Sequence, residues 1–352
     1  MKKRRFYYID ILNCMAIFFV LLMHAAQLAH FGDKTNSYFL ATNLVQTICI
    51  PAVYIFFMNS GATLLDYRES KTTKSFFIHR FKRVVVPFAF WTLLYYIYDT
   101  RYTAFPGPSF HSHPGIHDFI YAFSHNQINN IFWFFYAIIA LYLATPIFST
   151  LIHEHKALLA SVVVIWFVFN DGISYVEGLT HLSLYTEYIN QPLLASSYLG
   201  YFIAGYLIRI NYFSHKTENI LILVGVLTLL MGIINTLIQG KLALFRNIGP
   251  FFYSVAIVLL IKRLGNQIKS ESVLHCFTVL SGASLGIYIL HPLFYAVCDK
   301  LVFHASVKGW DQYLRVLNNP IHIFVLPIFA YIVMATAILI LKRSKIVRTI
   351  LP

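Results

Sequence analysis

The sequence predicts an all-α, polytopic membrane protein, a bundle of about ten transmembrane helices. Apolar residues make up 58% of the 352 residues, charged residues only 12%, and the mean hydropathy is +0.66. Such a composition is typical of integral membrane proteins and excludes an ordinary soluble domain. Apolar runs long enough to cross the hydrocarbon layer recur along the chain. We place them at residues 8–30, 41–65, 84–102, 131–152, 157–171, 192–210, 219–239, 246–263, 276–298 and 319–341.

Charge placement predicts the orientation of these helices. With the amino terminus inside, 20 of the 27 Lys and Arg residues fall in cytoplasmic segments, and an inverted map would reverse the excess. Cytoplasmic loops normally carry such an excess. We therefore expect a multi-pass cell-membrane protein with both termini in the cytoplasm and residues 1–352 in a single transmembrane domain. The net charge of +13 reflects this bias and does not call for nucleic acid as a partner.

The first apolar run carries a histidine deep in the predicted bilayer. At 1.5 Å per residue, His24 lies roughly 21 Å above Asp10, past the midplane. An ionisable side chain there is costly, so it is expected to face a cavity or a partner. Asn13 stands eleven positions earlier, close to three full turns, so we expect both side chains to point into one cavity. A neutral, hydrogen-bonded structural histidine is the alternative.

Two more apolar runs contain polar side chains. Asn59, Ser60 and Gly61 form a small polar notch, which could equally be a helix crossing built from small residues. In the ninth run, His291 follows Tyr288 and lies near the depth of His24. Two membrane histidines at one height indicate a shared site, although His291 could also be structural.

A cationic segment precedes the third apolar run. Arg80 and Arg83 belong to a dense collar of positive charge at the predicted inner mouth of the bundle. Arginine clusters suit phosphates because the guanidinium makes bidentate contacts. The same charges are also expected simply to keep this loop inside.

A metal site is not expected. His113 and His117 have the spacing of helical metal ligands, but Pro114 and Gly115 lie between them and interrupt a helix.

Short motifs along nearly the whole chain resemble those of the acyltransferase 3 family of bacterial integral membrane O-acyltransferases. Each motif is weak alone, but together and in this order they are specific to the family. They are Asp10-Ile11-Leu12 with Ala16 and His24, Phe57-x-x-Ser60-Gly61, Arg80-x-x-Arg83-x-x-x-Pro87, Trp133-Phe134-Phe135, Leu141-Tyr142-Leu143-x-x-Pro146, Gly200-Tyr201-Phe202-x-x-Gly205-Tyr206, and Ser284-Leu285-Gly286-Ile287-Tyr288-x-Leu290-His291.

The resemblance implies a stand-alone enzyme that moves an acyl group, acetyl being favoured, from cytoplasmic acyl-CoA to a hydroxyl of a cell-surface glycan or lipid-linked sugar. His24 would act as general base, or would itself be transiently acylated. The expected catalytic residues are His24, His291 and Asn13. The expected donor-binding residues are Arg80, Arg83, Ser60, Asn59 and Tyr288.

One position departs from the family pattern. Members usually carry an arginine on the first helix where this chain has Asn13, and that arginine is associated with activity. We therefore expect Asn13 to contact the donor arm by hydrogen bonding, or another cation to act in its place. A transporter of a lipid-linked sugar or polysaccharide is the rival function, and a pure binding module is a third. Against transport, no matched pair of interrupted helices marks two inverted halves.

Overall fold

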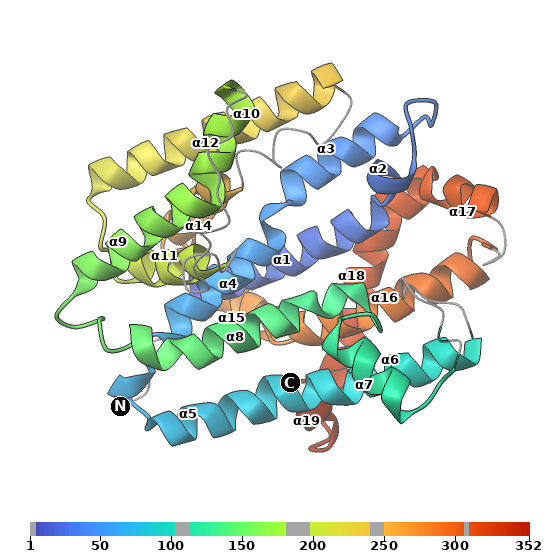
Figure 1. Ribbon diagram of the computed structural model, residues 1–352, viewed down its shortest axis with the longest axis horizontal. Coiled ribbons are helices and arrows are strands. Elements are labelled where there is room, and N and C mark those ends of the chain that lie inside the picture. The colour runs from blue at the N-terminus through green and yellow to red at the C-terminus, as the bar shows by residue number, and fades with distance from the viewer. Residues whose placement is uncertain (1–4, 103–110, 112, 181–197, 240–249, 306–309) are drawn as a thin grey trace.

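Helices make up all the regular structure in the part of the chain that the computed structural model describes, residues 5–102, 111, 113–180, 198–239, 250–305 and 310–352 (Figure 1). The all-α prediction is confirmed for these residues. The α-helices are α1 (Tyr7–Ala25), α2 (Leu28–Phe31), α3 (Phe39–Cys49), α4 (Pro51–Leu64), α5 (Thr73–Arg80), α6 (Val86–Tyr102), α7 (Ile116–Ser124), α8 (Trp133–Phe148), α9 (Lys156–Phe167), α10 (Ile173–Thr180), α11 (Leu199–Arg209), α12 (His215–Gln239), α14 (Phe251–Gly265), α15 (Glu271–Ser281), α16 (Ser284–Leu301), α17 (Trp310–Leu317), α18 (Leu326–Leu341) and α19 (Val347–Ile350).

Fewer helices are long and apolar enough to cross a membrane than the sequence predicts. Within the described residues five pass by length and composition, and the bent pair α15–α16 makes a sixth. The runs at 192–210 and 246–263 begin in segments outside the described residues, so only their later parts, in α11 and α14, can be compared. A total of about ten spans therefore stays a prediction.

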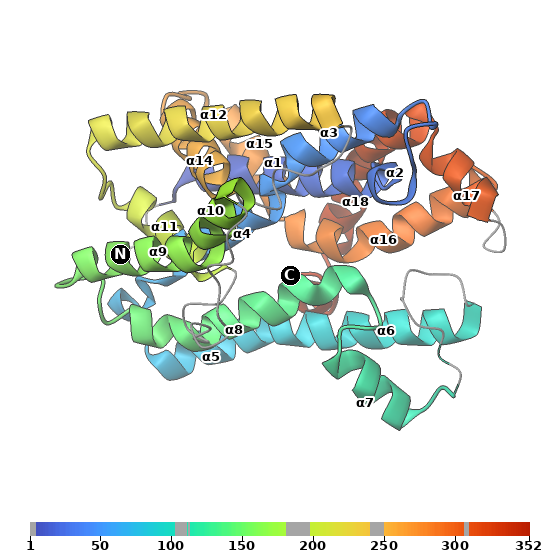
Figure 2. The same cartoon turned by 45° about the horizontal axis from the view of Figure 1, so that its top comes forward.

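Helix α1 lies in the middle of the bundle, whereas α12 lies at one edge and α5 and α6 at the other (Figures 1 and 2). In the most apolar stretch of α1, 56% of the residues are buried, against 22% in α12. A helix that is apolar on all sides is buried in protein or surrounded by lipid. The sequence patterns of the two are alike, but α1 is enclosed by protein and α12 faces outward.

Two glycines allow α4 and α11 to approach each other closely. A Cβ atom built on Gly61 would overlap the carbonyl oxygen of Phe202, and one on Gly205 would overlap that of Met58. Small residues let helix backbones approach this closely in membranes. Gly61, one part of the polar notch on α4, therefore forms a helix crossing. The same crossing fixes the position of the neighbouring Asn59.

The predicted ninth span is broken. Helix α15 ends at Ser281, α16 begins at Ser284, and their axes differ by 53°. The carbonyl oxygen of Gly282, between them, accepts a hydrogen bond from Lys342 Nζ at 2.5 Å. The break turns Ser281 and Ser284 towards α1, where each makes a hydrogen bond with Asn13.

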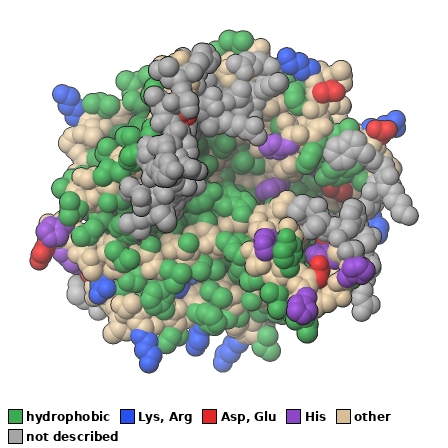
Figure 3. All heavy atoms as spheres, viewed as in Figure 1, with side chains coloured by type: hydrophobic (Ala, Val, Ile, Leu, Met, Phe, Trp, Pro, Cys, Tyr) green, Lys and Arg blue, Asp and Glu red, His purple; other side chains and the backbone are tan. Residues whose placement is uncertain are grey.

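The outer surface agrees with a lipid environment. The face in Figure 3 is dominated by hydrophobic side chains, and its Lys and Arg side chains lie towards the rim. Many large apolar side chains of α12 and α18 are exposed, among them Ile238 at 77% and Ile332 at 59%. These stripes are expected to contact membrane lipids.

Candidate active site

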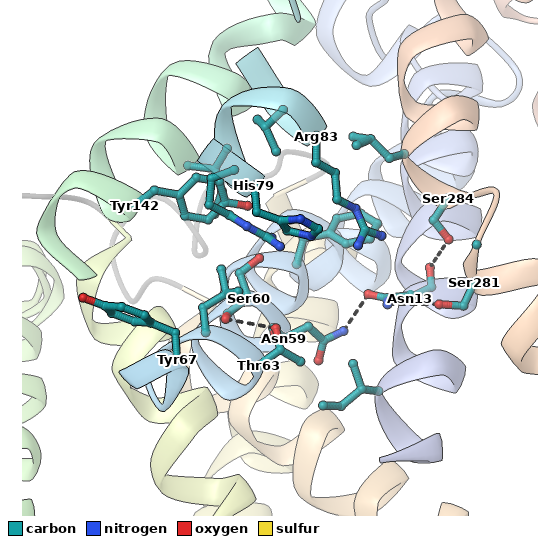
Figure 4. A pocket seen from close by; sticks show the side chains of 18 of the residues that line it. Asn13, Asn59, Ser60, Thr63, Tyr67, His79, Arg83, Tyr142, Ser281 and Ser284 are labelled. Atoms are coloured by element: carbon teal, nitrogen blue, oxygen red, sulfur yellow. Dashed lines mark hydrogen bonds between the residues drawn. The ribbon is translucent and has the colours of Figure 1, made fainter. Parts of the chain in front are cut away.

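A cavity of about 820 Å³ opens at the end of the bundle where α1 begins (Figure 4). Its walls come from α1, α4, α5, α8, the segment before α6, and the break between α15 and α16. Six of the residues predicted for the site line it: Asn13, Asn59, Ser60, Arg80, Arg83 and Tyr288. Tyr288 closes its inner end.

Asn13 is the centre of a polar bridge on the cavity wall. Its Oδ1 accepts from Asn59 Nδ2 at 2.8 Å, and its Nδ2 donates to Ser281 Oγ at 3.1 Å. Ser284 Oγ also donates to the Asn13 carbonyl oxygen at 3.4 Å. The bridge joins α1, α4 and the α15–α16 break. Asn13 faces the cavity as expected, but part of its hydrogen-bonding capacity is already used by these helices.

Arginines line the mouth of this cavity, and they differ in whether their charge is already neutralised. Arg5 pairs with Asp10 at 2.8 Å, and the buried Arg209 pairs with Asp66 at 2.8 Å. Arg80 and Arg83 make no ion pair with the described residues, and Arg80 Nε is buried without a hydrogen-bond partner there. Their charge is therefore available to an anion.

The arrangement in Figure 4 shows where these cations point. The Arg83 guanidinium extends across the cavity towards Asn13 and Ser284. Arg80 lies with its guanidinium carbon 5.8 Å from the centre of the Tyr142 ring. Partial burial, together with the positive charges of Arg80, Lys71 and Arg83, lowers the pKa of His79, which also lines the mouth. The three neighbouring cations make the potential at the mouth positive, which suits an anionic ligand.

His24 lines a second, smaller pocket of about 180 Å³. Asn13 and His24 therefore line different cavities rather than the single one expected from the sequence. His24 Nδ1 lies 3.3 Å from the amide nitrogen of Gln27, one helical turn further on. The His24 ring also contacts the His291 ring, with 4.9 Å between their centres. The two rings lie in contact, and their sharing of one catalytic site stays a prediction.

The orientation of His291 follows from the proline after it. Pro292 has no N–H, so the carbonyl oxygen of Tyr288, four residues earlier, loses its helical donor. His291 Nδ1 bonds to that oxygen at 2.8 Å and to the Ile287 carbonyl at 3.2 Å. Carbonyl oxygens only accept, so Nδ1 carries the proton and Nε2 holds a lone pair. Nε2 is fully buried and has no partner in the described structure.

Tyr288 separates the two cavities. Its side chain lines both, and its hydroxyl donates to the carbonyl oxygen of Ile131, just before α8. The hydroxyl predicted to steady a thioester oxygen is thus held by the backbone in this structure.

Two glutamines were missed by the sequence reasoning. Gln27 lies just past the end of α1, and Gln46 lies in α3. Each is a few residues from an end of a predicted apolar run, so neither is marked by the sequence as a polar residue deep in the bilayer. Gln46 Nε2 donates to the carbonyl oxygens of Met23 at 2.7 Å and Ala26 at 3.2 Å, so it binds the carboxyl end of α1. Both glutamines line the small pocket beside His24.

Comparison with known families bears on this arrangement. Residues 6–341 match the family model Acyltransferase domain, which covers nearly the whole chain. The chain belongs to the acyltransferase 3 family. No match was found among curated proteins or among solved structures.

Membership of the acyltransferase 3 family, together with the apolar helices, makes the chain a multi-pass membrane acyltransferase. Within the described residues of this acyltransferase 3 member, no group of three or more His, Cys, Asp or Glu side chains could hold a metal ion. Helix α7 begins at Ile116, after the interrupting Pro114 and Gly115, so that His117 is helical and His113 is not.

Proposed function

We propose that the protein transfers an acyl group, acetyl foremost, from acyl-CoA bound in the large cavity to a sugar hydroxyl presented in the small pocket. The observation that carries this proposal is the pair of cavities on either side of Tyr288. One has at its mouth Arg80 and Arg83, which form no ion pair within the described part of the chain, and the other contains His24. The acceptor would be a cell-surface glycan or a lipid-linked sugar of a bacterial membrane.

The charge distribution supports a donor that enters from the cytoplasm. Arg80 and Arg83 would bind the phosphates of coenzyme A, because guanidinium–phosphate pairs are strong and bidentate. Asn59, Ser60 and the second N–H of Asn13 would contact the amide-bearing arm. The end of the bundle with these cations would then lie in the cytoplasm, with both termini, as the excess of Lys and Arg indicates.

His24 would act as general base on the acceptor hydroxyl. Rotating the side-chain amide of Gln27 so that its oxygen and nitrogen exchange places would put the oxygen 3.3 Å from His24 Nδ1, where the nitrogen now lies. Nδ1–H then donates to Gln27, and Nε2 keeps the lone pair that a base requires. Histidine and amide are paired in this way in Cys-His-Asn proteases.

The proposed reaction balances in protons and bonds. His24 Nε2 takes the hydroxyl proton, and the oxygen attacks the thioester carbonyl carbon. The carbon–sulfur bond breaks, and the proton passes from His24 to the departing thiolate, giving an ester and free coenzyme A. The Nε2 lone pair of His291 would stabilise the protonated His24 ring beside it. Tyr288, once released from Ile131, would donate to the thioester oxygen.

The test is acyl transfer by the purified protein in nanodiscs. His24→Ala should abolish acetyl transfer while acetyl-CoA still binds, because the residue lies outside the donor cavity. His275→Ala is the matched control, since His275 is an exposed histidine on α15. Full transfer by a folded His24→Ala protein would refute the role of His24. Mass spectrometry of surface glycans from cells with and without the gene would identify the acceptor.

The rival function, transport of a lipid-linked sugar, would need a continuous polar path. Two distinct cavities are present within the described residues, and Tyr288 lines both of them. The separation favours a reaction in which only the acyl end of the donor passes.

A further inference from the structure

The small pocket beside His24 has a chemical character of its own. Its lining consists of Val20, Met23, His24, Gln27, His30, Gln46, Val53, Ile131, Trp133 and Tyr288. We propose that this pocket binds one uncharged, hydroxyl-bearing ring of the acceptor and excludes rings that carry a carboxylate or phosphate. This inference rests on the proposed acyl transfer. It adds the place where the acceptor ring binds and a selection rule, namely that uncharged rings are accepted and anionic rings are excluded.

The size of the pocket limits what it holds. Its volume is about 180 Å³, whereas pockets for drug-sized ligands hold about 300–1,000 Å³. A single sugar residue fits this space and an oligosaccharide does not. The rest of a longer acceptor must therefore remain outside the pocket, and only the ring that is modified enters.

Among the described residues, no Lys, Arg, Asp or Glu lines the small pocket, whereas the large cavity is lined by Arg5, Lys71, Arg80, Arg83 and Arg209. A carboxylate or phosphate moved from water into the small pocket would find no formal countercharge in its wall. Such desolvation is expensive unless the charge is paired. A neutral polyol avoids this cost.

The polar atoms that remain free suit hydroxyl groups. Both N–H bonds of the Gln46 amide point to the backbone carbonyls of Met23 and Ala26. The side-chain carbonyl oxygen of Gln46 therefore remains for a ligand, and it can accept a hydrogen bond from a hydroxyl. Trp133, which also lines the pocket, has an apolar ring and an indole N–H donor. Together they offer hydrogen bonds and a flat apolar contact without any charge.

Val53 on α4 allows the pocket to be filled without changing a polar group. Val53→Trp should reduce transfer to a neutral sugar at least about tenfold, because the bulk occupies the acceptor space. Coenzyme A binding should stay unchanged, since Val53 does not line the donor cavity. Val226→Trp is the matched control, because Val226 is 39% exposed on the outward-facing α12. Val53→Leu adds less bulk and serves if Val53→Trp folds poorly. Its transfer rate should lie between that of the wild type and that expected for a filled pocket.

The selection rule is tested with two probes that both lack the C6 hydroxyl and differ in charge, a neutral glucoside (methyl glucuronamide) and methyl glucuronoside, each incubated with acetyl-CoA and the protein in nanodiscs. Mass spectrometry measures the acetyl ester. The wild type should acetylate the neutral glucuronamide at least about tenfold faster than the glucuronoside. Equal rates with the two probes, or no transfer to either despite donor binding, would overturn the inference.

The same assays separate this inference from the proposed function. Wild-type transfer rates in Val53→Trp, with normal donor binding, would overturn the acceptor site alone. Failure of the wild type to bind coenzyme A would overturn the proposed acyl transfer on which the inference rests.

Discussion

Removing Arg80 or Arg83 tests the donor site most directly. Arg5 and Arg209 already have carboxylate partners, whereas the Nε of Arg80 is buried without an acceptor in the described residues. A charge-assisted hydrogen bond to phosphate should therefore be lost in Arg80→Ala with nothing to replace it. Such bonds contribute about 1.5–3 kcal/mol, and about 1.4 kcal/mol is a tenfold change in affinity. Each substitution should weaken coenzyme A binding about ten- to one-hundredfold.

Calorimetry with coenzyme A in nanodiscs measures this loss. Lys82→Ala is the matched control, because Lys82 lies between the two arginines in sequence, is exposed, and does not line the cavity. It removes the same charge from the same segment and should change affinity little. Equal weakening by Lys82→Ala and Arg80→Ala would show that only the overall charge matters. Unchanged affinity in both arginine variants would refute the phosphate assignment.

Three further results are expected. Gln27→Leu should lower the transfer rate at least about tenfold, because one hydrogen bond to His24 is lost. Gln27→Glu should keep much of the wild-type rate, because its carboxylate offers an oxygen to His24 Nδ1. Wild-type rates in both variants would contradict the positioning role of Gln27. Gly205→Ala should lower the melting temperature or prevent folding, since its Cβ would overlap the Met58 carbonyl; a melting temperature equal to the wild type's would argue against the tight crossing. Burial and the neighbouring cations lower the pKa of His79. Donor phosphates should raise it again by offsetting those cations, so binding takes up a proton, and affinity should rise more steeply with falling pH than in His79→Gln. Parallel pH profiles of the two proteins would exclude this coupling.

The general architecture and several site residues could be predicted from the sequence, because they depend on local spacing. Helix rise alone gave similar depths for His24 and His291, and their rings lie in contact. The apolar run at 8–30 was longer than α1, which ends at Ala25, where Gln46 from another helix binds the carbonyls of Met23 and Ala26. A contact between segments this far apart leaves no periodic signal.

The separation of the site into two cavities could not be read from the sequence. It depends on the Tyr288 ring, whose hydroxyl reaches a backbone oxygen of Ile131, 157 positions away. The same holds for the neutralised arginines, because Arg209 meets Asp66 only after α4 and α11 pack together. Spacing places a residue on a helix face, but side-chain orientation and distant partners decide which cavity it enters.

The ring of Tyr288 also bears on the energetics of the membrane. A continuous polar channel across the membrane would let ions cross in the direction of the membrane potential. Each charge that crosses releases about 2.3 kcal/mol for each 100 mV. In the proposed reaction the phosphates remain with Arg80 and Arg83, and only an uncharged acyl end passes Tyr288. The potential would then do no work on the proposed transfer, and a cell could acylate its exterior from its interior without discharging the membrane.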